Sequence, residues 1–209
     1  MTAVILANGE IKNYIATKHA LAVANFIVVA DGGLRHAHSM GVIPHAIIGD
    51  MDSAPPEILE QMRELDSTTI VTYPTNKDET DLELALSFAW GHGAINIRVI
   101  GALGNRSDHA LANMHLLATK PQQIELWDET TSIQLINNSL DLPKEKYDVL
   151  SLIPLTTEVT GIKTQGLTYP LNNETLKIGT TRGISNTFEK ETATVSIGNG
   201  LLLAIRQKS

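Results

Sequence analysis

Short, unbroken runs of aliphatic residues recur along the N-terminal part of the chain. They are rich in valine and isoleucine and lack a clean alternation of polar and apolar positions. This pattern is typical of strands that are buried on both faces of a parallel sheet. The expected strands are Ala3–Ala7, Phe26–Ala30, Ala46–Ile48, Thr69–Tyr73 and Ile95–Ile100.

Helical spacing of apolar residues fills three of the segments around these strands. The first pattern, Ala54–Leu65, opens with two prolines, which are tolerated in the first turn of a helix. The other two are Asp81–Trp90 and Ser107–Thr119. Strands that alternate with helices predict an α/β domain with a mainly parallel sheet.

After about Pro121 the pattern changes to short strands without helices between them. Turn residues such as Gly198-Asn199-Gly200 separate the runs. The expected strands are Ile124–Trp127, Ser132–Ile136, Tyr147–Ile153, Val159–Thr164, Leu167–Leu171, Glu174–Ile178, Ala193–Ile197 and Leu201–Arg206. Closely spaced short strands predict a β-sandwich or barrel. We therefore expect an α/β domain over residues 1–125 and an all-β sandwich domain over residues 126–209.

Composition narrows the range of functions. The 209 residues carry a formal net charge of −7, no cysteine and only 4% aromatic residues. An acidic chain without a basic run has little electrostatic attraction for nucleic acid, and the missing cysteines exclude thiol catalysis, disulfides and thiolate metal sites. Since no apolar run approaches the roughly 20 residues of a membrane span and no signal peptide is visible, we expect a cytoplasmic protein without a membrane partner.

Four clusters that contain aspartate follow strands or precede helices in the α/β part. They are Asp31-Gly32-Gly33, Gly49-Asp50-Met51-Asp52-Ser53, Lys77-Asp78-Glu79-Thr80-Asp81 and Gly101–His109. In an open α/β sheet, ligands bind outside the carboxyl ends of the strands. An acidic protein that binds a phosphate there needs a divalent cation to mask its own charge.

The first two clusters each allow two interpretations. Taken alone, Asp31 is better explained as the cap of a plain strand-to-helix turn than as a ligand-binding residue, although the two glycines would allow close backbone approach to a ligand. If the backbone around Met51 is extended, Asp50 and Asp52 point to the same side, and their repulsion favours a bound Mg²⁺. The structural alternative makes Ser53 or Asp52 the N-cap of the next helix, which explains one acidic residue but not both.

The other two clusters combine helix starts with phosphate-binding groups. Thr80 and Glu83 form a capping box, while Asp78 and Asp81 could share a helical face. Lys77 is a candidate partner for phosphate. Arg106 can grip phosphate with its forked donors, and Asp108 can bind metal, ribose or the attacking hydroxyl.

A last run, Arg182–Asn186, lies among the expected strands of the C-terminal part. By chemistry alone it is a turn between strands.

Taken together, five runs in register resemble the thiamine pyrophosphokinase family. They span residues 30 to 186, and the matching pieces are Ala30-Asp31-Gly32-Gly33, Gly49-Asp50-Met51-Asp52-Ser53, Lys77-Asp78-Glu79-Thr80-Asp81, Gly104-Asn105-Arg106-Ser107-Asp108-His109 and Gly183-Ile184-Ser185-Asn186. The resemblance implies transfer of a pyrophosphoryl group from ATP to the thiamine hydroxyl, which yields thiamine diphosphate and AMP. It also implies a homodimer whose active site is shared between the α/β domain of one subunit and the sandwich of the other.

The resemblance also implies roles for individual residues. Asp50, Asp52 and Asp81 correspond to magnesium ligands, and Ser185 and Asn186 lie on the thiamine side. The residues on the ATP side are Asp31, Gly32, Gly33, Lys77, Asp78, Thr80 and Arg106. Asp81, Arg106 and Asp108 are the implied catalytic residues, with Asp108 orienting or deprotonating the thiamine hydroxyl.

The chain departs from the family pattern at a few positions. Met51 stands where the family usually has Phe, and Ala102 and Asn105 stand in a loop that usually has more glycine. No Trp is present in the C-terminal part, so Tyr169 or Phe188 is expected to supply the ring contact to thiamine. Two other functions stay open: a pyrophosphokinase for a pterin alcohol, and a non-catalytic sensor of nucleotide or thiamine.

Overall fold

The computed structural model describes residues 1–104, 106–119 and 123–208 and divides them into two compact units. The first unit holds residues 1–116 and 123–129, and the second holds residues 117–119 and 130–208. No helix within the described ranges is long and apolar enough to cross a membrane. Each unit has its own core.

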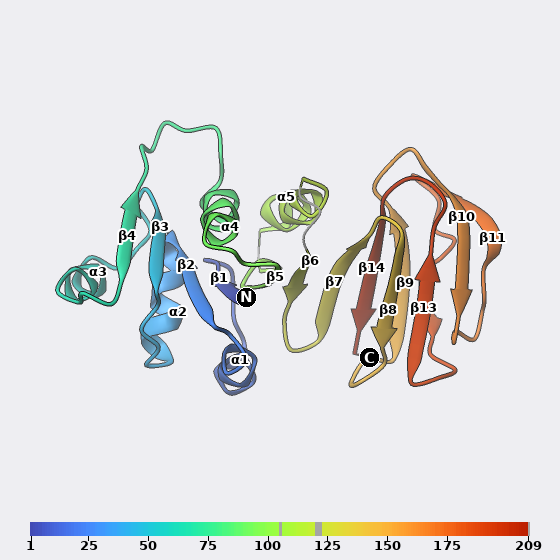
Figure 1. The fold of residues 1–209 in the computed structure, drawn as a ribbon, viewed down its shortest axis with the longest axis horizontal. Helices are drawn as coiled ribbons and strands as arrows, with labels where there is room; N and C mark the ends of the chain where they lie inside the picture. The colour runs from blue at the N-terminus through green and yellow to red at the C-terminus, as the bar shows by residue number, and fades with distance from the viewer. Residues whose placement is uncertain (105, 120–122, 209) are drawn as a thin grey trace. The chain divides into compact units, whose positions relative to one another are not determined.

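The first unit is built on a parallel sheet flanked by helices (Figure 1). Its strand order is β6-β5-β1-β2-β3-β4, and all five pairings are parallel. The strands are β1 (Thr2–Leu6), β2 (Phe26–Ala30), β3 (Ala46–Gly49), β4 (Thr69–Thr72), β5 (Asn96–Ile100) and β6 (Gln123–Trp127). The helices are α1 (Tyr14–Leu21), the 3₁₀ turn η1 (Asp31–Gly33), α2 (Leu34–Ser39), α3 (Pro56–Arg63), α4 (Asp81–Gly91) and α5 (Ser107–Leu116).

Alternate side chains of the central strands enter two different apolar layers. On one face, Val4 and Leu6 of β1 join Val29 of β2 in a cluster with Leu34 of α2 and Leu59 of α3. On the other face, α4 lies against β1, β2 and β3. Burial on both faces explains why these strands are continuous apolar runs in the sequence. The mainly parallel sheet expected from the sequence is confirmed.

The second unit is a sandwich of two antiparallel sheets. One has the order β12-β9-β14-β7 and the other the order β11-β10-β13-β8. The strands are β7 (Thr131–Ile136), β8 (Ser139–Pro143), β9 (Val149–Pro154), β10 (Glu158–Gln165), β11 (Asn172–Lys177), β12 (Asn186–Thr187), β13 (Thr192–Ser196) and β14 (Leu202–Gln207). Side chains of both sheets, including Leu150, Leu202, Val159 and Val195, share one buried cluster. The expected all-β sandwich is therefore confirmed.

The strands differ from those expected from sequence in four places. β8 and β12 were not expected, and two expected runs have a different structure. The run Leu167–Leu171 is not a strand: only Leu167 makes an isolated bridge, to Phe188, while Thr164 accepts from the Leu171 amide and closes a loop. The run Ile124–Trp127, which we grouped with the sandwich strands, forms β6 and pairs in parallel with β5. A short apolar run alone does not reveal its pairing partner or direction.

A candidate phosphate and cation site at the switch point of the sheet

The order of the parallel strands creates a crevice at one point of the sheet edge. From β1 the chain proceeds to β2 on one side, whereas β5 lies on the other side of β1. Loops that leave two such strands diverge, and the space between them is where open α/β sheets bind ligands. Here a cavity of about 710 Å³ lies among the loops that follow β1, β2, β3 and β5 and the segment before α4.

The loops after β1 and β5 touch through their backbones. The Gly9 amide donates to the Gly101 carbonyl at 2.9 Å. A Cβ on Gly9 would lie 2.2 Å from that oxygen, and a Cβ on Gly104 would lie 2.6 Å from the Glu10 nitrogen. Only glycine permits such contact, so these residues fix the width of the crevice.

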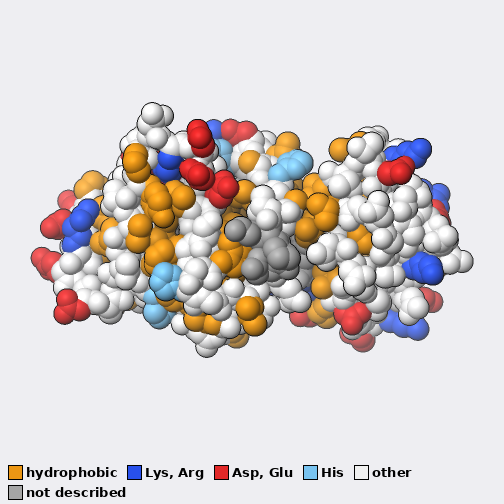
Figure 2. All heavy atoms as spheres, turned by 45° about the horizontal axis from the view of Figure 1, so that its top comes forward, with side chains coloured by type: hydrophobic (Ala, Val, Ile, Leu, Met, Phe, Trp, Pro, Cys, Tyr) orange, Lys and Arg blue, Asp and Glu red, His pale blue; other side chains and the backbone are white. Residues whose placement is uncertain are grey.

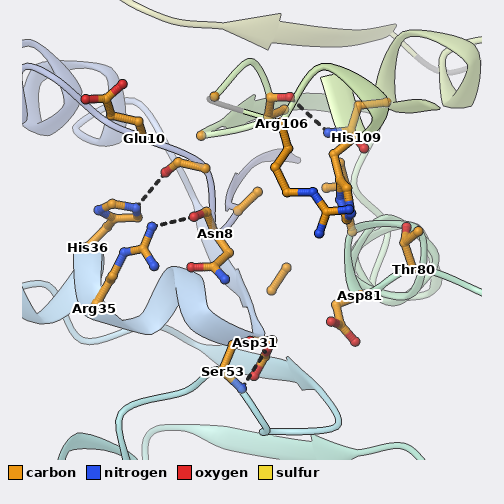
Figure 3. A pocket seen from close by; sticks show the side chains of 18 of the residues that line it. Asn8, Glu10, Asp31, Arg35, His36, Ser53, Thr80, Asp81, Arg106 and His109 are labelled. Atoms are coloured by element: carbon orange, nitrogen blue, oxygen red, sulfur yellow. Dashed lines mark hydrogen bonds between the residues drawn. The ribbon is translucent and has the colours of Figure 1, made fainter. Parts of the chain in front are cut away.

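The buried residue His36 is hydrogen-bonded to the loop after β1 (Figure 3). His36 Nε2 lies 2.8 Å from the Gly9 carbonyl, and Nδ1 lies 2.8 Å from the Tyr14 hydroxyl. Because a carbonyl only accepts, Nε2 carries the proton, and Nδ1 accepts from Tyr14 in the neutral ring. Burial lowers the pKa of His36, which keeps the ring neutral. The neighbouring Arg35 donates to the Asn8 carbonyl.

Three carboxylates converge at the cavity from the ends of β2 and β3. Oxygens of Asp31, Asp50 and Asp52 all lie within 4.8 Å of one another. The backbone between Asp50 and Asp52 is not extended, so the condition considered for this pair is not met. Met51 adopts a left-handed conformation with φ 67°, and the Asp52 amide donates to Asp50 Oδ1 at 3.2 Å. Asp31 is also left-handed, with φ 41°. Such conformations are costly outside glycine and concentrate at functional sites.

Asp31 is the most buried member of this group. Its side chain is 4% exposed, and Oδ2 accepts from the Ser53 amide at 3.3 Å. Its other oxygen, Oδ1, has no hydrogen-bond partner among the described residues. Burial raises the pKa of Asp31, and the negative charge of Asp81 raises it further. A buried carboxylate oxygen without a donor needs a positive partner.

The donor set therefore fits a divalent cation. Hard carboxylate oxygens on three residues, one of them buried and without a donor, are the ligands that such ions prefer. Figure 2, in which the top of Figure 1 comes forward, shows acidic side chains gathered on the upper part of the α/β unit.

Lys77 joins the acidic groups from the segment before α4. Its Nζ lies 3.0 Å from Asp50 Oδ2 and 3.1 Å from Asp81 Oδ1. The hydrogen bond from Lys77 lowers the pKa of Asp50. Burial by itself would lower the pKa of Lys77, but the two carboxylates outweigh it and raise that pKa. Lys77 and Asp50 are therefore both ionised.

Arg106 and Asp108 form an exposed ion pair at the start of α5. Arg106 Nη2 lies 2.6 Å from Asp108 Oδ2, and Nε donates to Oδ1 at 3.2 Å. The hydrogen bonds from Arg106 lower the pKa of Asp108 to about 2. Figure 3 shows Arg106 reaching into the cavity from the side opposite Asp31 and Ser53.

The cavity collects most of the residues that we expected from the sequence. The expected site residues that line it are Asp31, Asp50, Asp52, Lys77, Thr80, Asp81 and Arg106. The expected site residues Gly32, Gly33, Asp78 and Asp108 are not among its lining residues. A Cβ on Gly32 would lie 2.5 Å from the Asn8 side chain, and one on Gly33 would lie 2.3 Å from the Leu6 carbonyl. These glycines thus allow η1 to pack against the end of β1.

Several capping alternatives are settled by the helix starts. Pro55 is the N-cap residue of α3 and makes no side-chain cap, so the capping role considered for Ser53 or Asp52 is wrong. Asp31 does not act as a cap either. Thr80 does cap α4, since its hydroxyl accepts from the Glu83 amide at 3.2 Å. Asp78 precedes α4 and therefore shares no helical face with Asp81.

Sequence reasoning missed the polar residues on the β1 side of the cavity. These are Asn8, Gly9, Glu10, Tyr14, Arg35 and His36. The only sequence feature that pointed to them was the Asn8-Gly9 pair directly after the first strand. This pair predicts a turn but does not reveal which residues the turn contacts.

In the second unit, the side chain of Asn186 binds the backbone of Tyr169. This side chain is buried, and it exchanges hydrogen bonds with the amide and carbonyl of Tyr169 at 3.0 and 2.7 Å. The Tyr169 side chain is 69% exposed, whereas Phe188 is buried in the sandwich core. Ser185 is left-handed, with φ 58°, and its amide donates to Ser151 Oγ. Of the two rings considered for a ligand contact, only Tyr169 is accessible in this unit.

Fold and site together define an α/β protein of the class that handles phosphate with carboxylate-bound cations. Comparison with known proteins narrows this class. A family model described as "Thiamin pyrophosphokinase, catalytic domain" matches residues 17–127, and one described as "Thiamin pyrophosphokinase, vitamin B1 binding domain" matches residues 137–202. The chain therefore belongs to the thiamin pyrophosphokinase family.

Individual relatives agree with this assignment. The thiamine pyrophosphokinase of Bacillus subtilis (strain 168) is 33% identical in an alignment of 180 residues, and the match covers 79% of each chain. The crystal structure of thiamine pyrophosphokinase from Bacillus subtilis matches with a TM-score of 0.88 and 29% identity over 100% of both chains. A thiamin pyrophosphokinase family protein from Enterococcus faecalis matches with a TM-score of 0.84 and 29% identity, again over 100% of both chains.

Proposed function

We propose that this chain is a thiamine pyrophosphokinase, which transfers the pyrophosphoryl group of ATP to the hydroxyl of thiamine and releases AMP. The observation that carries the proposal is the convergence of Asp31, Asp50 and Asp52 on a cavity at the switch point of the sheet. The two matched family domains supply the choice of acceptor.

In the proposed reaction, the thiamine hydroxyl oxygen attacks the β-phosphorus of ATP. An O–P bond to thiamine forms, and the bond between the β-phosphorus and the oxygen bridging to the α-phosphorus breaks, so AMP leaves with that oxygen. The proton of the thiamine hydroxyl is released to water. Transfers of this kind depend on alignment and on neutralising charge rather than on a covalent enzyme intermediate. We assign alignment to the rigid loops after β1 and β5.

Magnesium is the cation that we propose for the site, with Asp50, Asp52 and Asp81 as ligands as expected from the sequence. Asp31 joins this proposal because its oxygens lie within 4.8 Å of those of Asp50 and Asp52. When bound, the ion neutralises negative charge on the phosphates. Lys77 and Arg106 add positive charge on two sides of the cavity.

Asp108 is proposed to orient the acceptor side rather than to remove its proton. Its pKa of about 2 and its hydrogen bonds from Arg106 make it a weak base near neutral pH. Gly32, Gly33 and Asp78 stay predictions on the ATP side, as do Ser185 and Asn186 on the thiamine side. We propose that Asn186 acts there by holding the Tyr169 segment, and that the exposed ring of Tyr169 contacts thiamine.

The assignment of ligands to the two domains is likewise a proposal. We assign ATP and metal to the α/β domain and thiamine to the sandwich domain, with the active site shared across a homodimer. An expected cytoplasmic location stays a prediction. A mixing experiment tests the shared site: Asp52→Asn and Tyr169→Ala proteins should be inactive alone but regain about a quarter of wild-type activity after subunit exchange. Mixtures that stay inactive although co-purification of differently tagged subunits shows exchanged dimers would contradict sharing.

The function itself is tested by the nucleotide product. Purified protein is incubated with ATP, Mg²⁺ and thiamine, and nucleotides are separated by chromatography. AMP that appears only when thiamine is present is the expected result. ADP would indicate an ordinary kinase, and binding without product would indicate a sensor. A pterin alcohol that outcompetes thiamine as acceptor would redirect the assignment to the other pyrophosphokinase class.

A further inference from the structure

One ammonium group bridges two carboxylates that belong to different elements of the cavity. Lys77, before α4, contacts Asp50 at the end of β3 and Asp81 at the start of α4, with distances of 3.0 and 3.1 Å. Their side chains are 11%, 8% and 27% exposed. This is a partly buried ion triad and not a solvated surface pair, so it is not simply screened by water.

Without Lys77, four aspartates would place an excess of negative charge in this part of the cavity. Asp50, Asp52 and Asp81 each lie close enough to Asp31 to raise its pKa. Lys77 is the group whose ammonium directly pairs with two of them. In the absence of a metal ion, Lys77 therefore supplies the positive charge that lets Asp50 and Asp81 remain close.

We propose that Lys77 is a resident counter-ion of the cation site, which holds Asp50 and Asp81 until a divalent cation arrives and then turns to the phosphates of the nucleotide. The inference rests on the proposed function and adds an ordering to it. A divalent cation and an ammonium group repel one another, so each weakens the binding of the other to the same carboxylates. The flexible four-carbon stem of lysine allows the amine to move without a change in the backbone.

The consequence is that metal and nucleotide bind favourably only together. If a cation bound without ATP, Lys77 would have to leave two ion pairs and its amine would lack a partner. With ATP present, the amine of Lys77 could pair with phosphate instead. Lys77 thus opposes binding of the bare ion and supports binding of the metal–nucleotide complex.

A resident counter-ion and a simple phosphate contact differ in the sign of a mutational effect. Replacing a residue that only contacts phosphate leaves binding of the bare metal unchanged. Replacing a resident counter-ion strengthens it. For Lys77→Met we expect bare Mn²⁺ to bind about tenfold more tightly than to the wild type, since two ion pairs no longer have to be broken. Binding of ATP in the presence of metal should weaken by about tenfold in the same variant.

The test is a titration of protein with Mn²⁺ alone, followed by electron paramagnetic resonance of the free ion. Lys77→Met and Lys77→Gln both remove the charge, while Lys77→Arg keeps it and should bind Mn²⁺ as weakly as the wild type. Lys18→Met is the matched control, because Lys18 is an exposed residue of α1 that does not line the cavity. Circular dichroism confirms that each variant is folded.

Tighter Mn²⁺ binding by both neutral variants, with no change in Lys77→Arg and Lys18→Met, is the expected result. Unchanged or weaker binding by the neutral variants would overturn the inference. A Lys77→Met chain that folds only with Mg²⁺ supports it as well, since the ion then replaces the missing charge, whereas a chain unfolded with and without Mg²⁺ contradicts it. The wild-type AMP assay judges the proposed function separately, because this titration contains neither ATP nor thiamine.

Discussion

Replacing Asp31 with asparagine should make the metal-free protein more stable while removing its activity. Asp31 is buried, its Oδ1 lacks a hydrogen-bond partner among the described residues, and burial followed by the charge of Asp81 raises its pKa. Asparagine has nearly the same shape, tolerates the left-handed backbone at this position and can still accept from the Ser53 amide. The substitution therefore removes a buried charge without creating a cavity.

The size of the effect follows from the separation of the carboxylates. At 4.8 Å, two unit charges repel by about 3.5 kcal/mol at an effective dielectric constant of about 20, and by about 0.9 kcal/mol in bulk water. Asp52 is exposed and Asp50 is paired with Lys77, so the repulsion that Asp31 feels lies between these limits. We expect a gain of roughly 1–3 kcal/mol, which for a protein of this size raises Tm by roughly 2–10 °C.

The dependence on pH has a definite sign. The pKa of Asp31 is raised in the folded state, so its contribution to stability is complete below the ordinary Asp pKa of 3.8 and is lost as pH rises through the raised value. Asparagine avoids that loss. The stability difference between the variant and the wild type should therefore be largest at neutral pH and disappear below pH 3.8.

Thermal denaturation in EDTA measures this difference, with Asp66→Asn as the matched control on an exposed aspartate outside the cavity. The control should stay within about 0.5 kcal/mol of the wild type. Excess Mg²⁺ with ATP should stabilise the wild type but not Asp31→Asn. An Asp31→Asn protein that melts below the wild type in EDTA at neutral pH would refute the reasoning, because Asp31 would then be a stabilising residue.

Three further predictions concern other parts of the site. Gly9→Ala should lower the free energy of unfolding in urea by about 1–3 kcal/mol and abolish activity, because its Cβ would lie 2.2 Å from the Gly101 carbonyl oxygen. Gly91→Ala is the control: a Cβ there meets nothing within 4 Å, so the substitution should be neutral or slightly stabilising. Equal losses of stability in both variants would contradict the prediction. His36→Ala should raise KM for ATP by about tenfold with a smaller change in kcat, because the loop after β1 loses its support; an unchanged KM would be evidence against that role. Asp108→Asn should lower kcat/KM but keep the shape of its pH profile above about pH 5, because the Asp108 pKa is about 2; loss of a limb near neutral pH would mean that Asp108 is the base after all.

The elements that the sequence predicted well are those whose burial leaves a clear pattern. Phe26–Ala30 is β2 as expected, because all five of its residues are apolar and the last three are buried between β1 and β3. The start of α4 at Asp81 was equally clear, since Thr80 supplies a cap that the sequence displays. Local chemistry was sufficient in both places.

Elements without such a pattern were missed. α1 buries only Thr17, Ala20 and Leu21, so its sequence carries little amphipathic signal. α2 is only six residues long. β12 has only two residues, and the sandwich positions it by pairing with β9. These elements are determined by tertiary contacts, which a single sequence does not reveal.

The residues of the site also fall into those that the sequence predicted and those that it did not. The aspartates could be predicted because acidic residues at the ends of apolar strands are conspicuous in the sequence. His36 could not, because its hydrogen bond to the Gly9 carbonyl spans 27 positions of the chain and its helix gives no local reason for a buried histidine. The contact of Lys77 with the carboxylates was also hidden, since the sequence suggested only phosphate as its partner.

The central claim is that the β- and γ-phosphoryl groups of ATP move together to thiamine. Phosphorus-31 NMR of a reaction with protein, ATP, Mg²⁺ and thiamine tests it directly, because the fate of each phosphorus can be followed in one sample. The account predicts that the β and γ signals of ATP disappear together into a thiamine-linked diphosphate while the α-phosphorus becomes AMP. Appearance of ADP and a thiamine monophosphate, or of free phosphate without a thiamine product, would contradict it.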